Sequence, residues 1–188
     1  MTTTSSQGLV TAEELLELSA NGFYGELVRG ELVEFMPPGF RHGKVVGLIT
    51  YLLCAFVIPR ELGTIAAGDS GVVLERDPDT VRGPDVAFYS AQTLPLDDDN
   101  PSYSEVVPDL AVEVGSPNDS MSERESRARM WVGHGVPLVW MVHPESRSID
   151  VYRPGQEIET LGVGDQITGH DVIPGFQSAA SDLFAAPR

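Results

Sequence analysis

Lysine is almost absent from this sequence, because Lys44 is the only one among 188 residues. Lysine and arginine together number 12 against 28 aspartates and glutamates, so the formal net charge is −16. Such a chain lacks the clustered cations that a broad, non-specific nucleic-acid footprint requires. The acidic balance is compatible with a site that gathers carboxylates around divalent cations, and equally with charge that serves solubility alone.

Cysteine is just as rare, since Cys54 stands alone and no disulfide can form within the chain. In its apolar run Cys54 is expected to be a small buried hydrophobe, in a reducing, cytoplasmic compartment. The first residues, MTTTSSQG, lack the basic start and apolar stretch of a secretion signal. The longest apolar run, residues 45–58, is shorter than the roughly 20 residues that span a bilayer. We therefore expect a cytoplasmic protein without membrane association.

Local patterns predict alternating helices and strands within one domain. We expect a disordered tail at residues 1–10, a single domain at 11–175 and a C-terminal segment at 176–188. The predicted elements are a helix from Thr11, a hairpin around Arg29-Gly30, a helix at 42–58, strands at 71–75, 85–89, 107–114, 137–143 and 148–153, a helix at 120–134 and a terminal hairpin. This order predicts a mixed α/β or α+β fold.

The strand VPDLAVEVG, residues 107–115, carries two acids among apolar residues. Side chains alternate across a strand, so Asp109, Ala111 and Glu113 share one face. Four residues of strand span about 13 Å, which is too far for both acids to hold one ion. Glu113 therefore needs a partner on another strand, whereas Asp109 has the position of a strand-entry residue that bonds local N–H groups.

A second strand, GPDVAFY at residues 83–89, supplies that partner, because Asp85 shares a face with the small Ala87. If the two strands pair, Asp85 and Glu113 converge with room for water. Mg²⁺ and Mn²⁺ prefer such hard oxygen ligands, and the carbonyl of Val114 could add another. An ion held there could activate water for phosphodiester hydrolysis.

The helix that follows the acidic strand places Glu123, Arg127 and Trp131 on one face, at spacing i, i+4, i+8. Either Glu123 and Arg127 form a surface pair with Trp131 packed beneath, or Arg127 projects toward the strand carboxylates and binds a phosphate. His42, at the start of its helix, could also lie near a phosphate. The other histidines lack zinc-type spacing, and no serine-hydrolase set or glycine-rich phosphate loop is present in the sequence.

The chain contains in order the GELVEFMPP hairpin, His42 and the segments GPDVAF, VPDLAVEVGSPN, WVGHGVP and LVWMVHP. In this order they resemble the Uma-two family. Its members are restriction-endonuclease-like proteins of the PD-(D/E)XK nuclease superfamily. The resemblance runs from about residue 11 to about residue 175. It implies a restriction-endonuclease-like core, in which a central mixed β-sheet is flanked by helices, with an N-terminal helix and β-hairpin.

The resemblance also implies roles for individual residues. Asp85 takes the position of the metal-binding aspartate and Glu113 that of the second acid, with Mg²⁺ or Mn²⁺ as the cofactor. The family's lysine lies on the next helix, four residues before an aromatic residue, and here that position is Arg127. The further candidates for contact with the substrate are His42, Lys44 and Glu123.

Arginine at position 127 departs from the family's pattern. The guanidinium stays protonated and is therefore a poor base, although it can neutralise charge on a phosphate. The leading expectation is a metal-dependent nuclease acting on DNA, and small nucleases of this fold often form homodimers. The alternative is a weakened or inactive nuclease fold that serves as a binding or assembly module. A metal-dependent hydrolase of a small phosphorylated substrate would also suit the acidic charge.

Overall fold

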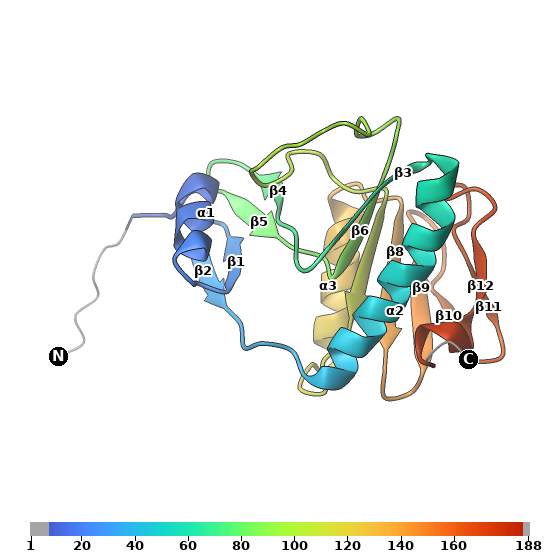
Figure 1. Ribbon diagram of the computed structural model, residues 1–188. Helices are drawn as coiled ribbons and strands as arrows, with labels where there is room; N and C mark the ends of the chain where they lie inside the picture. The colour runs from blue at the N-terminus through green and yellow to red at the C-terminus, as the bar shows by residue number, and fades with distance from the viewer. Residues whose placement is uncertain (1–7, 186–188) are drawn as a thin grey trace.

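A six-stranded mixed sheet runs through the computed structural model, which describes residues 8–185 (Figure 1). Its strands, in spatial order, are β10 (Glu159–Leu161), β9 (Ser148–Tyr152), β8 (Leu138–His143), β7 (Leu110–Val114), β6 (Val86–Ser90) and β3 (Gly63–Ala67). Only β7 and β8 pair in parallel, because the helix α3 (Met121–Gly133) carries the chain back between them. The predicted mixed α+β class, with a central mixed sheet flanked by helices, is confirmed.

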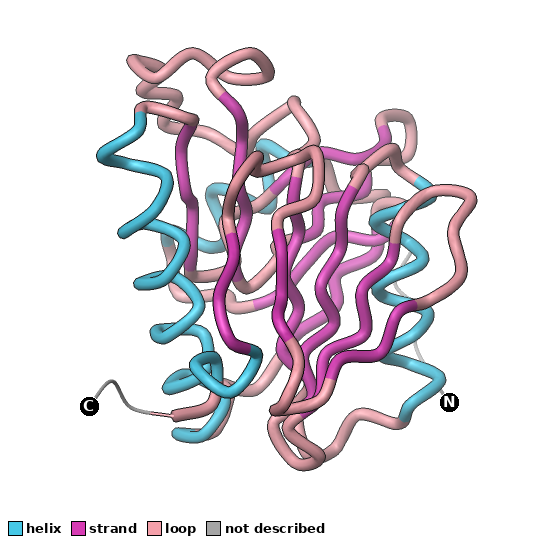
Figure 2. The backbone as a smooth tube through the Cα atoms, turned by 90° about the vertical axis from the view of Figure 1, so that its right-hand side faces the viewer, coloured by secondary structure: helices cyan, strands magenta, loops and turns pink. Residues whose placement is uncertain are grey.

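Both faces of this sheet are covered by helix (Figure 2). On one face Leu110, Val112 and Val114 of β7 pack with the long helix α2 (Phe40–Val57), and on the other face Ala111 packs with α3. The alternation expected for β7 is therefore correct. The alternation also explains why Glu113 is buried, because its side chain lies on the same face of β7 as Ala111 and is covered by α3.

A smaller sheet lies beside the N-terminal helix α1 (Ala12–Ala20). Its order is β2 (Glu31–Glu34), β1 (Gly25–Val28), β5 (Thr80–Arg82) and β4 (Val72–Glu75). The predicted capping box at Thr11 and Glu14 is present, and the predicted hairpin turn is formed by Arg29 and Gly30, both at positive φ.

Strands β3 and β5 are not among the elements predicted from the sequence. Residues 63–67 of β3 read Gly-Thr-Ile-Ala-Ala, which has little alternation, and β5 lies inside the turn-rich stretch DPDTVRGP. Both are held as strands by their neighbours, since β3 pairs with β6, and β5 pairs with β1 and β4. Tertiary pairing therefore overrides local propensity in these two segments.

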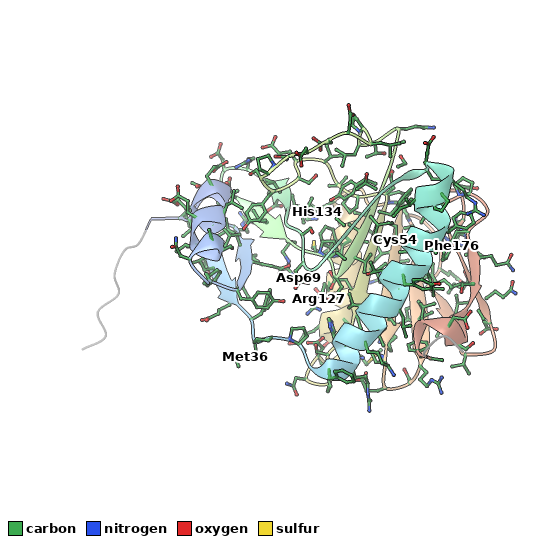
Figure 3. All side chains as sticks on the ribbon, viewed as in Figure 1. Met36, Cys54, Asp69, Arg127, His134 and Phe176 are labelled. Atoms are coloured by element: carbon green, nitrogen blue, oxygen red, sulfur yellow. The ribbon has the colours of Figure 1, made fainter. Side chains whose placement is uncertain are left out.

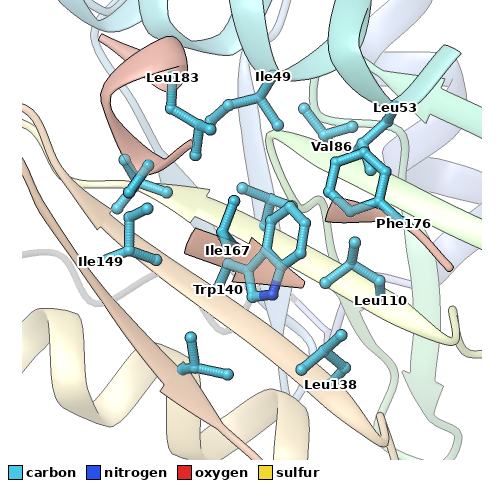
Figure 4. Packing of buried hydrophobic residues seen from close by; sticks show 14 of the residues in the cluster. Ile49, Leu53, Val86, Leu110, Leu138, Trp140, Ile149, Ile167, Phe176 and Leu183 are labelled. Carbon is cyan, nitrogen blue, oxygen red and sulfur yellow. The ribbon is translucent and has the colours of Figure 1, made fainter. Parts of the chain in front are cut away.

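The C-terminal part of the chain completes the main core (Figure 4). The hairpin of β11 (Gln166–Thr168) and β12 (Gln177–Ala179) is followed by the short helix η2 (Ala180–Leu183). Phe176 lies against Trp140 with ring centroids 5.8 Å apart, and Leu183 is buried in the same cluster. The packed core therefore continues past residue 175, where the sequence placed the end of the domain.

Helix α2 is longer than its apolar run suggested. Together with the turn η1 (Ile58–Arg60) it forms a 21-residue segment of mean hydropathy 1.6, long and apolar enough by length and composition to cross a membrane. The expectation that this segment is too short to span a bilayer is therefore wrong. One stripe of the helix, formed by Val45, Ile49, Leu53 and Val57, is buried against the sheet. A core helix of a globular protein passes the same test.

Candidate functional site: a carboxylate pair on adjacent strands

Asp85 and Glu113 lie side by side, as the sequence predicted, with Asp85 directly before β6 and Glu113 on β7. Strands β6 and β7 pair antiparallel with Val86 opposite Val112, and one residue further in the same register Asp85 stands opposite Glu113. Both residues are buried, with Glu113 only 4% exposed. The antiparallel register therefore brings together two acids that are 28 positions apart in the chain.

Asp85 is held by the backbone of β7 and by α2. Its Oδ2 accepts the N–H of Val114 at 2.7 Å, and its Oδ1 lies 3.2 Å from Nε2 of His42. Burial lowers the pKa of His42, but the hydrogen bond and charge of Asp85 outweigh it, so this pKa is raised above its ordinary value. His42 Nδ1 is buried and has no hydrogen-bond partner among the described residues.

Glu113 accepts a hydrogen bond from Trp131 and lies near Arg127. The distance from Trp131 Nε1 to Glu113 Oε1 is 2.6 Å, and that from Arg127 Nη1 to Glu113 Oε2 is 3.5 Å. Burial, followed by the charge of Asp85, raises the pKa of Glu113 to about 8, while Arg127 and Trp131 act in the opposite direction. Without a further cation Glu113 therefore binds its proton more tightly than an ordinary glutamate does.

Helix α3 directs Arg127 into the site and not toward a surface partner. Arg127 Nη1 is 3.8 Å from Asp119 as well as 3.5 Å from Glu113, whereas Glu123 accepts hydrogen bonds from the N–H and hydroxyl of Ser120. The surface pair of Glu123 and Arg127 that the spacing favoured is therefore not formed. Trp131, which packing alone would explain, also donates its indole N–H to Glu113.

The capping box that begins α3 should contribute measurably to stability. The Ser120 hydroxyl accepts the N–H of Glu123. We expect Ser120→Ala to lower the free energy of unfolding by about 1 kcal/mol, because a helix donor loses its partner. Urea denaturation measures this, with the exposed mid-helix Ser126→Ala as the control. Equal stability of the two variants would show that the cap contributes nothing.

Two of the residues predicted to contact the substrate do not reach the carboxylates. Lys44 is exposed on α2. Because residues two apart on a helix lie on different sides, Lys44 points away from the side of α2 on which His42 contacts Asp85. Glu123 serves the helix cap. Asp109 accepts hydrogen bonds from the N–H of Ser90 and the hydroxyl of Thr93. It is thus a strand-entry residue as expected, although its partners lie on and after β6.

Two further carboxylates beside the site were not predicted from the sequence. Glu26 on β1 lies 2.8 Å from the guanidinium of Arg82 and accepts the N–H of Gly83. Asp69, after β3, accepts a hydrogen bond from Tyr24. Burial raises the pKa of Glu26, and loss of hydration raises that of Asp69, which the charge of Asp85 raises further. Figure 3 shows Asp69 close to Arg127, whose charge acts on the Asp69 carboxylate.

The donor set fits a small, hard divalent cation. The pKa of Glu113 is raised first by burial and then by the charge of Asp85, and a bound cation would offset both effects. Within residues 8–185 no three acidic, histidine or cysteine side chains are grouped to hold an ion. Mg²⁺ is commonly held by one or two carboxylates with waters and substrate phosphates completing its coordination, so the pair suffices.

Comparisons with known proteins identify the family of the chain and a solved structure of similar fold. The family model Uma2, described as "Putative restriction endonuclease", matches residues 12–182. Among solved structures, a putative nuclease belonging to DUF820 from Anabaena variabilis ATCC 29413 is similar, with a TM-score of 0.77 and 20% sequence identity. The similarity covers 93% of this chain and 97% of that one. No curated protein matches the chain.

Proposed function

The chain belongs to the Uma2 family of putative restriction endonucleases, and from that premise we propose that it is a metal-dependent nuclease that hydrolyses phosphodiester bonds in DNA. One observation carries the proposal. Asp85, directly before β6, stands opposite Glu113 of β7 in the antiparallel register, and burial followed by the charge of Asp85 raises the pKa of Glu113. A fold that needs only stability gains little from such a buried pair.

Each residue of the site has a distinct role in this proposal. Asp85 and Glu113 would hold Mg²⁺ or Mn²⁺ with the carbonyl of Val114 as a further oxygen ligand. When bound, the ion supplies charge stabilisation and lowers the pKa of attacking water. His42 keeps Asp85 oriented and holds a proton on Nε2. Arg127 contacts the scissile phosphate, since its guanidinium neutralises charge but cannot accept a proton.

A second candidate function is supported by Arg127 itself. In this chain the guanidinium lies 3.5 Å from Glu113, so it already neutralises part of the charge that a metal would neutralise. The net charge of −16 also disfavours a DNA duplex. On these two observations the chain would be a binding or assembly module that has kept the nuclease fold and lost its catalytic activity.

Plasmid cleavage separates the two functions. Purified protein is incubated with supercoiled plasmid in Mg²⁺, Mn²⁺ or EDTA, and nicked and linear products are quantified. The nuclease predicts metal-dependent products, a rate for Arg127→Lys at or above that of the wild type, and a loss of about 100-fold in Arg127→Ala, because one charge at the phosphate is removed. Absence of cleavage by both the wild type and Arg127→Lys would favour the binding module.

A further inference from the structure

Residues 35–44, which comprise the link from β2 to α2 and the first five residues of α2 and are called the connection below, differ in charge from the rest of this acidic chain. The connection reads Phe-Met-Pro-Pro-Gly-Phe-Arg-His-Gly-Lys and contains no acid. Arg41 and Lys44 are exposed, and neither forms an ion pair with any residue from 8 to 185. By contrast, Arg76 and Arg82 are engaged by carboxylates. The two cations of the connection are therefore available to an anion from outside the chain.

The same connection presents large apolar side chains to solvent. Phe40 is 90% exposed and Met36 is 86% exposed, and Phe35 is partly exposed. Phe35 also packs edge-to-face on Tyr24, with ring centroids 6.5 Å apart. Exposed side chains of this size contribute little to the core, so their exposure points to a ligand with apolar faces.

Both ends of the connection meet the carboxylate site. At one end Tyr24, the partner of Phe35, donates a hydrogen bond to Asp69. At the other end His42, two residues after Phe40, contacts Asp85. Figure 3 shows Met36 between β2 and α2, below Asp69 and Arg127 in that view. A strand that leaves the carboxylates along this connection would pass the aromatic rings and the two cations.

We propose that residues 35–44 bind an unpaired strand of DNA that leads into the carboxylate site, an inference that deepens the proposed nuclease function and rests on it. Bases stack on Phe40 and Phe35, and Arg41 and Lys44 neutralise two backbone phosphates. Aromatic side chains interleaved with cations are the arrangement that binds single strands, whose bases are free to stack. A duplex offers paired, stacked bases and requires many more phosphate contacts than two.

Binding is measured without turnover, by fluorescence anisotropy in EDTA. The probes are an oligothymidylate of about 12 nucleotides and a hairpin duplex with the same label. We expect the single strand to bind more tightly, Phe40→Ala to weaken it about tenfold, and Tyr51→Ala to leave it unchanged. Tyr51 is the matched control because it is 60% exposed on the same helix but lies outside the connection.

Salt dependence tests the two cations separately. Each phosphate contact on a single strand contributes about −0.7 to the slope of log K against log salt. The double variant Arg41→Gln/Lys44→Gln should therefore make this slope shallower by about 1.4, while the contact of Arg127 with phosphate remains. A slope that is unchanged in the double variant would overturn the role of these residues.

Three results would overturn the proposal as a whole. The first is equal affinity of Phe40→Ala and Tyr51→Ala for the single strand. The second is tighter binding of the duplex than of the single strand. The third is light scattering that shows a dimer in the wild type and a monomer in Phe40→Ala, because a second copy of the chain would then cover the surface. Plasmid cleavage with unaltered strand binding in Phe40→Ala would overturn this inference alone. Strand binding that Phe40→Ala weakens, without plasmid cleavage by either the wild type or Arg127→Lys, would support this surface and overturn the nuclease function.

Discussion

Replacing Asp85 with Asn is expected to reduce metal-dependent DNA cleavage by at least about 100-fold, since the loss of a metal ligand should cost no less than the loss of a group that supports one. The amide keeps an oxygen that can accept the N–H of Val114, so the backbone of β7 retains its partner. What is lost is the negative charge opposite Glu113. The initial rate of plasmid nicking in Mn²⁺ measures the effect.

The control for this variant is Asp109→Asn. Asp109 follows a proline at the start of a strand just as Asp85 does, but it bonds to Ser90 and Thr93 and not to the site. The Asp109→Asn variant should nick plasmid DNA at a rate within a fewfold of that of the wild type. If Asp85→Asn cleaves as fast as Asp109→Asn, Asp85 holds no ion that matters to the reaction.

Replacing Glu113 with Gln should stabilise the metal-free protein at high pH. The folded pKa of Glu113 is about 8, above the ordinary value of 4.5 that the unfolded chain would show. A raised pKa means that the folded state binds the extra proton, so stability is complete below about pH 4.5 and decreases as the pH rises toward and through about 8. Glutamine mimics the protonated form and carries no such loss.

Thermal unfolding in EDTA measures this difference. Above about pH 8 the Glu113→Gln variant should melt at a higher temperature than the wild type, by an amount that corresponds to a few kcal/mol at most. Near pH 5 the two curves should converge. Saturating Mn²⁺ should then raise the melting temperature of the wild type and leave the variant almost unchanged. A wild type that is equally stable at pH 5 and pH 9 would contradict the raised pKa of Glu113.

The carboxylate pair could be predicted from the sequence because strand alternation is a local rule. Two strands with the same Pro-Asp entry, each with an alanine two residues later, indicated which faces would meet, and the observed register agrees. The capping boxes at Thr11 and Ser120 were equally predictable, since the partners are three residues apart.

Glu26 and Asp69 could not be predicted in the same way. Glu26 sits on a short strand as one of several acids around the hairpin turn, and nothing local distinguishes it from an acid on a solvated face. Asp69 follows β3, which has no clear alternation and is a strand because β6 pairs with it. Both join the site only through tertiary pairing between segments distant in sequence.

Arg127 shows where spacing stops being informative. Glu123 and Arg127 are four residues apart, and this geometry permits a surface pair. The outcome depended on the Ser120 cap, which engages Glu123, and on the buried Glu113, which attracts the guanidinium. A buried charge that needs a partner is a stronger constraint than an exposed pair, which is typically worth less than about 1 kcal/mol.

The central claim is that Asp85 and Glu113 together hold one divalent cation, and Mn²⁺ binding tests it most directly. Titration calorimetry on the DNA-free protein, run near pH 8 on the wild type, Asp85→Asn, Glu113→Gln and Asp109→Asn, separates the site from the rest of an acidic surface. We predict one Mn²⁺ per chain in the wild type and in Asp109→Asn, and no measurable site in the other two variants. Equal Mn²⁺ binding in all four proteins would contradict the claim.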